Sequence, residues 1–265
     1  MLLNASLNGS RFAQKAIGSN TIYPKGTIRE CTRHGINYRL DISDYMDHVI
    51  YFGFDNLTDF ERNSLYTLVK PGQVIFDVGG YIGDTALHFA RLQNNNGKIY
   101  CFEPVPYLFD RLTHNVGLNT FKNISIYNLA ISDTASELYF NVSRSQNSSG
   151  IFLSDKGSGQ SRKVVAIKLD DFCSEKNIDR IDLIKIDVEG FELKVLKGAE
   201  EILRKFRPKM FIEIDEVHLK RAGASAKEVV KMLLDLNYKI SRADTQETIG
   251  MDYNFEGKHF DIVCV

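Results

Sequence analysis

A short apolar run followed by a glycine-rich turn is the feature that most constrains the fold of this chain. Residues 73–77 read QVIFD, a stretch of β-forming residues typical of a buried parallel strand. The turn VGGYIGD follows directly, and residues 85–93 are predicted to form a helix. Glycines in this context allow the backbone to turn tightly and a ligand to approach it closely. The unit therefore predicts a ligand site at the end of the strand.

Strands and helices alternate along the rest of the chain. The predicted strands are residues 73–77, 98–103, 123–129, 181–187 and 209–214, and the predicted helices between them are residues 85–93, 107–117, 191–204 and 226–236. A final pair of strands, residues 238–241 and 261–265, resembles a hairpin. The pattern predicts an α/β, Rossmann-like fold: a mostly parallel seven-stranded sheet with an antiparallel edge strand and helices on both faces.

Two regions lie outside this pattern. Residues 1–59 are predicted to be an N-terminal extension that packs on the core or covers an acceptor site, with a short helix at 12–16 and a strand at 36–40. Residues 60–265 form the predicted main domain, which begins with a helix at 60–69. Within it, strands at 138–142 and 164–169 flank residues 143–162, which are rich in Ser, Gly, Asn and Gln. That composition favours a surface loop, and a lid formed by residues 145–150 is the alternative.

Composition excludes some classes of protein. The 265 residues include 33 basic and 34 acidic side chains, so no nucleic-acid partner is expected. No apolar run approaches 18 residues, so no membrane span is expected, and the N-terminus does not resemble a signal peptide. The four cysteines form no C-x-x-C pair, which disfavours zinc, and Cys101 and Cys264 are expected to be buried thiols. Reduced cysteines favour a cytoplasmic location. Self-association is left open.

Asp77 distinguishes between two nucleotide cofactors. A dinucleotide such as NAD places its pyrophosphate at this turn, where a carboxylate would repel it. S-adenosylmethionine (SAM) has no phosphate and carries a sulfonium and an ammonium group, which tolerate a nearby carboxylate. Asp77 therefore favours SAM over NAD.

A second acidic residue supports this choice. Glu103 ends the next predicted strand and is expected to accept hydrogen bonds from the ribose hydroxyls. Pro104 turns the chain, and the segment that holds Ala130 and Ile131 is expected to flank the adenine. The predicted cofactor-binding residues are Asp77, Gly79, Gly80, Tyr81, Gly83, Asp84, Thr85, Glu103, Pro104, Ala130, Ile131 and Asp187.

Several longer motifs resemble the FkbM family of SAM-dependent methyltransferases. They are PGQVIFDVGGYIGD at 71–84, KIYCFEPVP at 98–106, YNLAISD at 127–133, LDDF at 169–172, IDLIKIDVEGFELKVLKGAEEIL at 181–203 and RPKMFIEI at 207–214. The resemblance covers roughly residues 60–240 and implies the class I methyltransferase fold. It also implies O-methylation of a hydroxyl on a sugar, glycan or small natural product.

Two positions depart from the family pattern. Gly80-Tyr81 stands where Ala-Asn is more usual, so an amide that touches SAM is missing, and Asn237-Tyr238 replaces Gly-Tyr. The first 55 residues match no part of the family.

Methyl transfer to a hydroxyl benefits from a general base. Asp187 at the end of its predicted strand is the first candidate, and Glu189, Glu213 and His218 are the others. Lys185 shares a strand face with Asp187 and is expected to pair with it. No metal is expected, although Mg²⁺ held by the three carboxylates is a less favoured alternative. Glu192 is expected to be a solvated helix residue, and Glu189 is equally well explained as a helix cap.

Other functions stay open at this point. They are a methyltransferase that acts on protein or nucleic acid, a non-catalytic SAM-binding protein, and an NAD-dependent oxidoreductase, which Asp77 disfavours.

Overall fold

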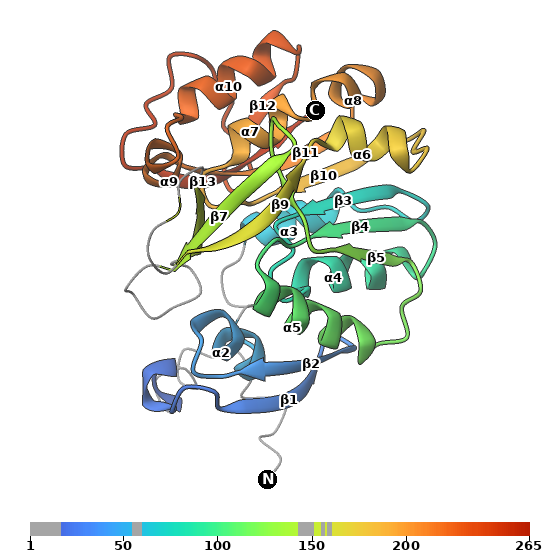
Figure 1. The fold of residues 1–265 in the computed structure, drawn as a ribbon, viewed down its shortest axis with the longest axis vertical. Coiled ribbons are helices and arrows are strands. Elements are labelled where there is room, and N and C mark those ends of the chain that lie inside the picture. The colour runs from blue at the N-terminus through green and yellow to red at the C-terminus, as the bar shows by residue number, and fades with distance from the viewer. Residues whose placement is uncertain (1–16, 55–59, 143–150, 155–156, 158–160) are drawn as a thin grey trace.

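A seven-stranded sheet forms the centre of the computed structural model, which describes residues 17–54, 60–142, 151–154, 157 and 161–265 (Figure 1). Its strands in chain order are β3 (Val74–Val78), β4 (Lys98–Phe102), β5 (Ile124–Tyr127), β10 (Leu183–Ile186), β11 (Lys209–Asp215), β12 (Ile240–Arg242) and β13 (His259–Cys264). The spatial order is β12-β13-β11-β10-β3-β4-β5. The order reverses between β3 and β10, and ligands of open α/β sheets bind at such a reversal.

The direction of the strands confirms the predicted fold class. Strands β5, β4, β3, β10 and β11 pair in parallel, and β13 is antiparallel to both of its neighbours. The sequence had suggested that the antiparallel strand lies at the edge of the sheet. In the structure it lies one position inside the edge. The last strand of the chain enters between β11 and β12, where it pairs Cys264 with Met210 and with Ile240.

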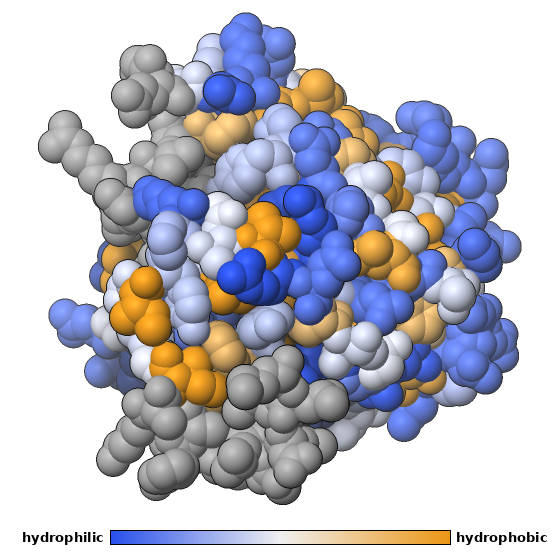
Figure 2. Space-filling view, turned by 90° about the horizontal axis from the view of Figure 1, so that it is seen from below, coloured by the Kyte–Doolittle hydropathy of each residue, from blue (hydrophilic) through white to orange (hydrophobic). Residues whose placement is uncertain are grey.

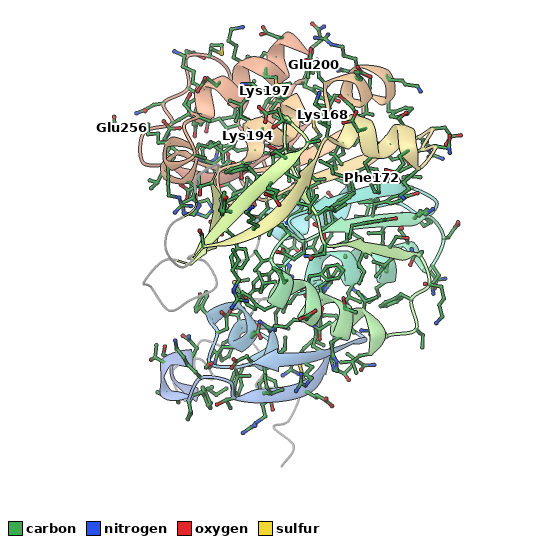
Figure 3. All side chains as sticks on the ribbon, in the orientation of Figure 1. Lys168, Phe172, Lys194, Lys197, Glu200 and Glu256 are labelled. Atoms are coloured by element: carbon green, nitrogen blue, oxygen red, sulfur yellow. The ribbon has the colours of Figure 1, made fainter. Side chains whose placement is uncertain are left out.

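Helices cover both faces of the sheet, as predicted. In Figure 1, α4 (Asp84–Gln93) and α5 (Pro106–Gly117) lie on one side, and α6 (Leu169–Glu175), α7 (Glu192–Lys197), α8 (Glu200–Phe206) and α10 (Ala226–Asp235) on the other. Alternate residues of β3 enter two separate cores: Ile75 packs in the cluster that contains α4, and Phe76 in the cluster that contains α7, α8 and α10. Phe172 of α6, which is labelled in Figure 3, meets Phe102 of the sheet edge-on, with ring centroids 5.0 Å apart.

The helix predicted over residues 191–204 is two helices. The first, α7, ends at Lys197, and α8 begins at Glu200. Gly198 lies between them and packs against the backbone of another segment: a Cβ on Gly198 would lie 2.0 Å from the carbonyl oxygen of Ser132. The periodicity of the apolar residues continues across the break, so the sequence pattern alone did not reveal it.

A second, smaller sheet follows β5. It contains β6 (Ala130–Ile131), β7 (Ser136–Val142), β8 (Ile151–Ser154) and β9 (Arg162–Ile167) in the order β6-β9-β7-β8. The prediction of one loop over residues 143–162 is therefore wrong for β8, which pairs with β7. The alternative of a lid at 145–150 lies outside the described residues. Leu153 of β8 faces the cavity described below.

The N-terminal region packs against the main domain. A short 3₁₀ helix, η1 (Asn20–Ile22), precedes the hairpin of β1 (Ile28–Arg33) and β2 (Ile36–Asp41), and α2 (Tyr45–Phe52) follows. Strand β2 contacts α4 and α5, while α3 (Phe60–Thr67) leads into the sheet. The helix predicted at 12–16 lies outside the described residues.

The surface of this end of the molecule is mixed. Among the described residues, its apolar side chains form several separate groups between hydrophilic ones (Figure 2). No described helix combines the length and the apolar character that a bilayer span requires. Cys101 and Cys264 are buried thiols, as predicted.

Candidate functional site

A cavity of about 690 Å³ opens at the carboxyl ends of the central strands. Most residues that the sequence singled out contribute to its wall. They are Gly79, Gly80, Tyr81, Asp84, Thr85, Glu103, Pro104, Ala130, Ile131, Asp187, Glu189, Glu213 and His218. The parallel strands bring them together because their carboxyl ends meet at one edge of the sheet. Asp77 and Gly83 do not line the cavity.

The glycine loop lies directly against the end of β10. A Cβ on Gly79 would stand 1.8 Å from the carbonyl oxygen of Asp187, and Gly79 has a φ of +89°. Only glycine fits this position without a shift of the backbone. The amides of Gly79 and Gly80 both donate hydrogen bonds to the carbonyl oxygen of Phe102, over 3.0 and 2.8 Å. The loop is thus fixed to both neighbouring strands.

The residue beneath position 80 explains why a glycine stands there. A Cβ at this position would lie 2.3 Å from Sγ of Cys101, which is fully buried. The thiol of Cys101 occupies the space that an alanine methyl group would need. The glycine at position 80, which departs from the family pattern, therefore fits the thiol of Cys101 on β4.

Lys185 connects the loop to two carboxylates. Its Nζ donates to the carbonyl oxygen of Gly79 over 2.8 Å and lies 3.2 Å from Oδ2 of Asp187 and 3.5 Å from Oδ1 of Asp77. Burial alone would lower the pKa of Lys185, but Asp187 and Asp77 raise it above its ordinary value. The predicted pairing of Lys185 with Asp187 is confirmed.

Asp77 is located differently from the sequence expectation. Its side chain is fully buried beneath the loop and has no surface in the cavity. It cannot touch a ligand directly in this arrangement, because the loop lies between them. Burial raises the pKa of Asp77, although the nearby Lys185 lowers it.

Glu103 contacts the glycine loop at the end away from Lys185. Its Oε2 accepts a hydrogen bond from the amide of Tyr81 over 2.8 Å, and its Oε1 accepts one from the amide of Val105 over 2.9 Å. Burial raises the pKa of Glu103 to about 7, although both amide hydrogen bonds lower it. Each oxygen keeps a further lone pair for a donor from the cavity.

Acidic side chains gather at the other end of the cavity. Asp187 follows β10, Glu189 follows it in the same turn, and Glu213 projects from the neighbouring strand β11. Burial and the neighbouring carboxylates of Glu213 and Asp187 raise the pKa of Glu189 to about 9. Burial and Asp187 also raise the pKa of Glu213, although its hydrogen bond with His259 lowers it. At neutral pH Glu189 therefore tends to hold a proton, and the pKa of Glu213 is shifted in the same direction.

Two histidines contact these acids. Nδ1 of His218 is 2.7 Å from Oε2 of Glu189, without the alignment of a hydrogen bond. Nε2 of His259 is hydrogen-bonded to Oε1 of Glu213 over 3.0 Å, and this bond raises the pKa of His259 to about 9. Burial lowers the pKa of His218, which is therefore neutral at pH 7. In the described part of the chain, no three His, Cys, Asp or Glu residues are arranged to hold a metal ion.

The expectation that Glu192 is a solvated residue is wrong. Its side chain is 1% exposed, and its Oε1 accepts hydrogen bonds from the amides of Val188 and Gly190. These bonds stabilise a turn in which Glu189 adopts a φ of +56° and Gly190 a φ of +106°. A Cβ on Gly190 would lie 2.4 Å from the carbonyl oxygen of His218, so the turn packs closely against α9 (Glu216–Arg221).

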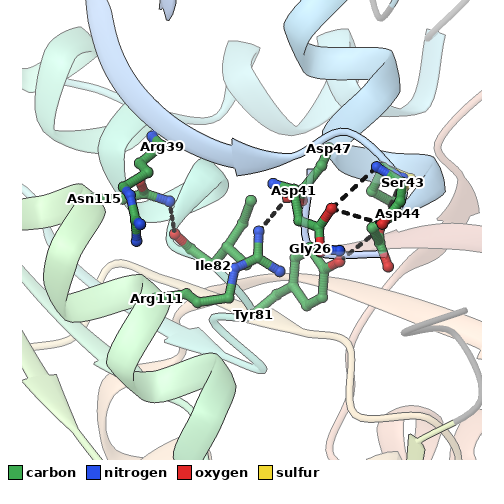
Figure 4. Close-up of polar contacts among 11 residues, drawn as sticks. Gly26, Arg39, Asp41, Ser43, Asp44, Asp47, Tyr81, Ile82, Arg111 and Asn115 are labelled. Carbon is green, nitrogen blue, oxygen red and sulfur yellow. Dashed lines mark hydrogen bonds and ion pairs between the residues drawn. The ribbon is translucent and has the colours of Figure 1, made fainter. Parts of the chain in front are cut away.

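The N-terminal region completes the wall near the glycine loop (Figure 4). The hydroxyl of Tyr81 donates to Oδ1 of Asp44 over 3.0 Å, and Arg111 of α5 forms an ion pair with the buried Asp47. Met46 and Ile50 of α2 line the cavity. The unusual tyrosine of the loop is thus bound by a segment outside the family pattern.

Asp84 also binds this region. Its Oδ1 accepts a hydrogen bond from the hydroxyl of Tyr38 over 2.6 Å, and its Oδ2 is paired with Arg62 of α3. Sequence reasoning did not identify the cavity residues from distant segments, because no local motif marks them. They are Met46, Ile50, Arg62, Leu153, Asp215, His259 and Asp261.

Comparison with known proteins assigns the family. The model of the methyltransferase FkbM domain matches residues 77–240, which is more than half of the chain. The chain belongs to the FkbM methyltransferase family. This confirms the resemblance that the sequence motifs indicated, and the family match includes the glycine loop, Glu103, Asp187 and Glu213.

Two relatives of this FkbM chain are named as methyltransferases, and one of the names specifies a sugar acid. The 2-O-methyltransferase NoeI of Sinorhizobium fredii is 31% identical over 161 residues, which are 55% of this chain and 65% of NoeI. The chain thus covers slightly less than two thirds of that relative. The hexuronic acid methyltransferase AglP of Haloferax volcanii is 29% identical over 180 residues, 67% of this chain and 69% of AglP. A solved FkbM methyltransferase from Methylobacillus flagellatus is 13% identical, with a TM-score of 0.47 over 83% of this chain and 65% of its own.

The fit between Gly80 and Cys101 can be tested by a double-mutant cycle. Gly80→Ala is expected to lower the free energy of unfolding by about 1–3 kcal/mol, because the added methyl group collides with the buried thiol. Adding Cys101→Ala to this variant should recover most of the loss, measured by urea denaturation. Gly117→Ala is the control, since a Cβ there meets no atom within 4 Å. Losses that simply add in the double variant would contradict the account.

Proposed function

We propose that this chain is a SAM-dependent O-methyltransferase that acts on a hydroxyl group of a sugar or a related small acceptor. One observation carries the proposal: a single cavity has the carboxyl group of Glu103 at one end and the acidic group of Asp187, Glu189 and Glu213 at the other. Membership of the FkbM family supports methyl transfer, the name of the 2-O-methyltransferase NoeI supports an oxygen acceptor, and the name of the hexuronic acid methyltransferase AglP supports a sugar.

The residues present fit SAM. Glu103 offers carboxylate lone pairs to the ribose hydroxyls, and Pro104, Ala130 and Ile131 supply an apolar wall for the adenine. Near Lys185, the carboxyl groups of Asp187 and Asp77 outnumber the single ammonium group, although burial raises the pKa of Asp77. These acidic groups favour a cationic cofactor over a pyrophosphate. When bound, SAM supplies an electrophilic methyl group.

Among the acidic residues, Asp187 is best suited to accept the proton of the acceptor hydroxyl. Its side chain is 45% exposed and faces the cavity beside Lys185. Burial and neighbouring carboxylates raise the pKa of Glu189 to about 9, so Glu189 tends to be protonated at neutral pH, and they also raise the pKa of Glu213. The two glutamates suit hydrogen bonding to the acceptor better than removal of its proton. His218, next to Glu189, is the remaining candidate base.

Glu103 predicts a pH dependence of cofactor binding. Its ionised form accepts the ribose hydrogen bonds, and its pKa is raised to about 7. The affinity for S-adenosylhomocysteine should therefore fall as the pH decreases below about 7, by up to roughly tenfold per pH unit. Glu103→Gln should bind more weakly and lose this pH dependence, measured by calorimetry between pH 5.5 and 8.5. Glu175→Gln, at an exposed position, is the control. An unchanged profile in Glu103→Gln would refute the assignment.

Asp187→Asn tests the proposed base. Turnover should decrease by about 10²–10⁴-fold, because the amide cannot take up the hydroxyl proton. S-adenosylhomocysteine should still bind, which calorimetry can establish on the same preparation. Asp171→Asn, exposed on α6, is a matched control. Asp187 is not the general base if Asp187→Asn keeps its turnover.

A protein that binds SAM but transfers no methyl group to any hydroxylated compound would instead be a non-catalytic SAM-binding protein.

A further inference from the structure

Two consecutive residues of the glycine loop are held by side chains from outside the loop. The hydroxyl of Tyr81 donates to Oδ1 of Asp44, at the start of α2, over 3.0 Å. Nδ2 of Asn115 on α5 donates to the carbonyl oxygen of Ile82 over 3.0 Å. Oδ1 of the same asparagine accepts from the amide of Arg39 on β2 over 2.8 Å. The N-terminal region therefore reaches the loop both directly and through α5 (Figure 4).

Tyr81 has a backbone conformation that tyrosine rarely adopts. Its φ is +51°, in the left-handed region, which costs a residue other than glycine about 1–2 kcal/mol. In this conformation its amide donates to Oε2 of Glu103 over 2.8 Å. A residue keeps such a conformation only when the surrounding contacts hold it there. The hydroxyl bond to Asp44 is a contact of this kind, at the far end of the same side chain.

Asp44 is held in place by its own surroundings. Its Oδ1 also accepts from the amide of Met46 over 3.1 Å and thereby caps α2. In the same turn of α2, the buried Asp47 forms an ion pair with Arg111 of α5, and its Oδ2 accepts from the amide of Asp41. The first turn of α2 is thus fixed to both β2 and α5, and it offers Tyr81 a rigid acceptor.

We propose that Tyr81 is a positioning residue for the cofactor: its bond to Asp44 holds the loop so that the amide of Tyr81 orients Glu103 toward the ribose. The inference rests on the proposed methyltransferase function and specifies how the cofactor end of its site is assembled. Asp44 does not line the cavity, so its effect on a ligand passes through the residues that it contacts. The N-terminal region thereby contributes to the affinity for the cofactor.

The amide bond to Glu103 provides a readout that a merely structural contact would not change. Burial raises the pKa of Glu103 to about 7, and the amide of Tyr81 lowers it. A weaker amide bond therefore moves this pKa upward. The other titratable groups that face Glu103 stay in place in the variants below; they are Asp77 of β3, Cys101 of β4, Tyr107 of α5 and Lys185 of β10.

A double-mutant cycle on the full chain tests the contact by calorimetry. Tyr81→Phe removes the hydroxyl and keeps the ring, while Asp44→Ser removes the carboxylate and keeps a side chain that caps a helix. Each change should weaken the binding of S-adenosylhomocysteine on the order of tenfold, because the lost bond is to a carboxylate. The double variant should bind about as tightly as each single variant. Tyr45→Phe is the matched control, since Tyr45 is 56% exposed on the same helix and lies outside the cavity wall.

The pH profile of the same binding separates positioning from a general loss of structure. In Tyr81→Phe and Asp44→Ser, the decrease in affinity toward low pH should begin at a higher pH than in the unaltered protein, because the pKa of Glu103 is higher. Tyr45→Phe should keep the original profile. Since coupling is reciprocal, S-adenosylhomocysteine should slow the hydrogen exchange of α2 amides in the unaltered protein and less so in Tyr81→Phe. Urea denaturation establishes that each variant is folded.

Three results would overturn the proposal. They are an unchanged affinity in Tyr81→Phe or Asp44→Ser, losses that add in the double variant, and a weaker affinity with an unchanged pH profile. Each of them leaves the methyltransferase function standing, because the unaltered protein still binds S-adenosylhomocysteine. If the unaltered protein binds neither SAM nor S-adenosylhomocysteine, both the positioning role and the function are wrong.

Discussion

Lys185 is the residue on which the arrangement of the site depends. It lies on the strand next to the glycine loop, and its ammonium group reaches the carbonyl oxygen of Gly79 and the carboxylates of Asp77 and Asp187. One buried cation thus fixes the loop, the end of β3 and the end of β10 in relation to each other. Without it, two carboxylates would face each other in a poorly solvated space, which is unfavourable. The cavity lies directly beside this contact of Lys185.

The sequence predicted the centre of this arrangement well. Residues at the ends of consecutive strands must meet at one edge of a parallel sheet, so Glu103, Asp187 and Glu213 could be placed together from the chain order alone. The pairing of Lys185 with Asp187 follows from the two-residue repeat of a strand. Local patterns predicted the helices less well: the apolar periodicity continues across the break at Gly198, a residue that packs against the backbone of Ser132 in a distant segment.

Contacts between distant segments set the limits of the sequence predictions. Asp77 is buried below the loop instead of lining the cavity, and Glu192 stabilises a turn instead of facing solvent. Neither burial can be inferred from neighbouring residues. The hydrogen bond of Tyr81 with Asp44 is similar, although the unusual tyrosine was a signal that another segment had to accommodate it. The N-terminal region therefore forms part of the cavity wall, through Met46 and Ile50 of α2.

The central claim is that the cavity at the sheet edge binds a cationic nucleoside cofactor and not a dinucleotide. Calorimetric titration of the same protein with SAM and with NAD tests it most directly, because both ligands contain adenosine and differ at the group that meets the glycine loop. The account predicts saturable binding of SAM with one molecule per chain and no measurable heat from NAD. Binding of NAD as tight as that of SAM, or no binding of SAM, would contradict it.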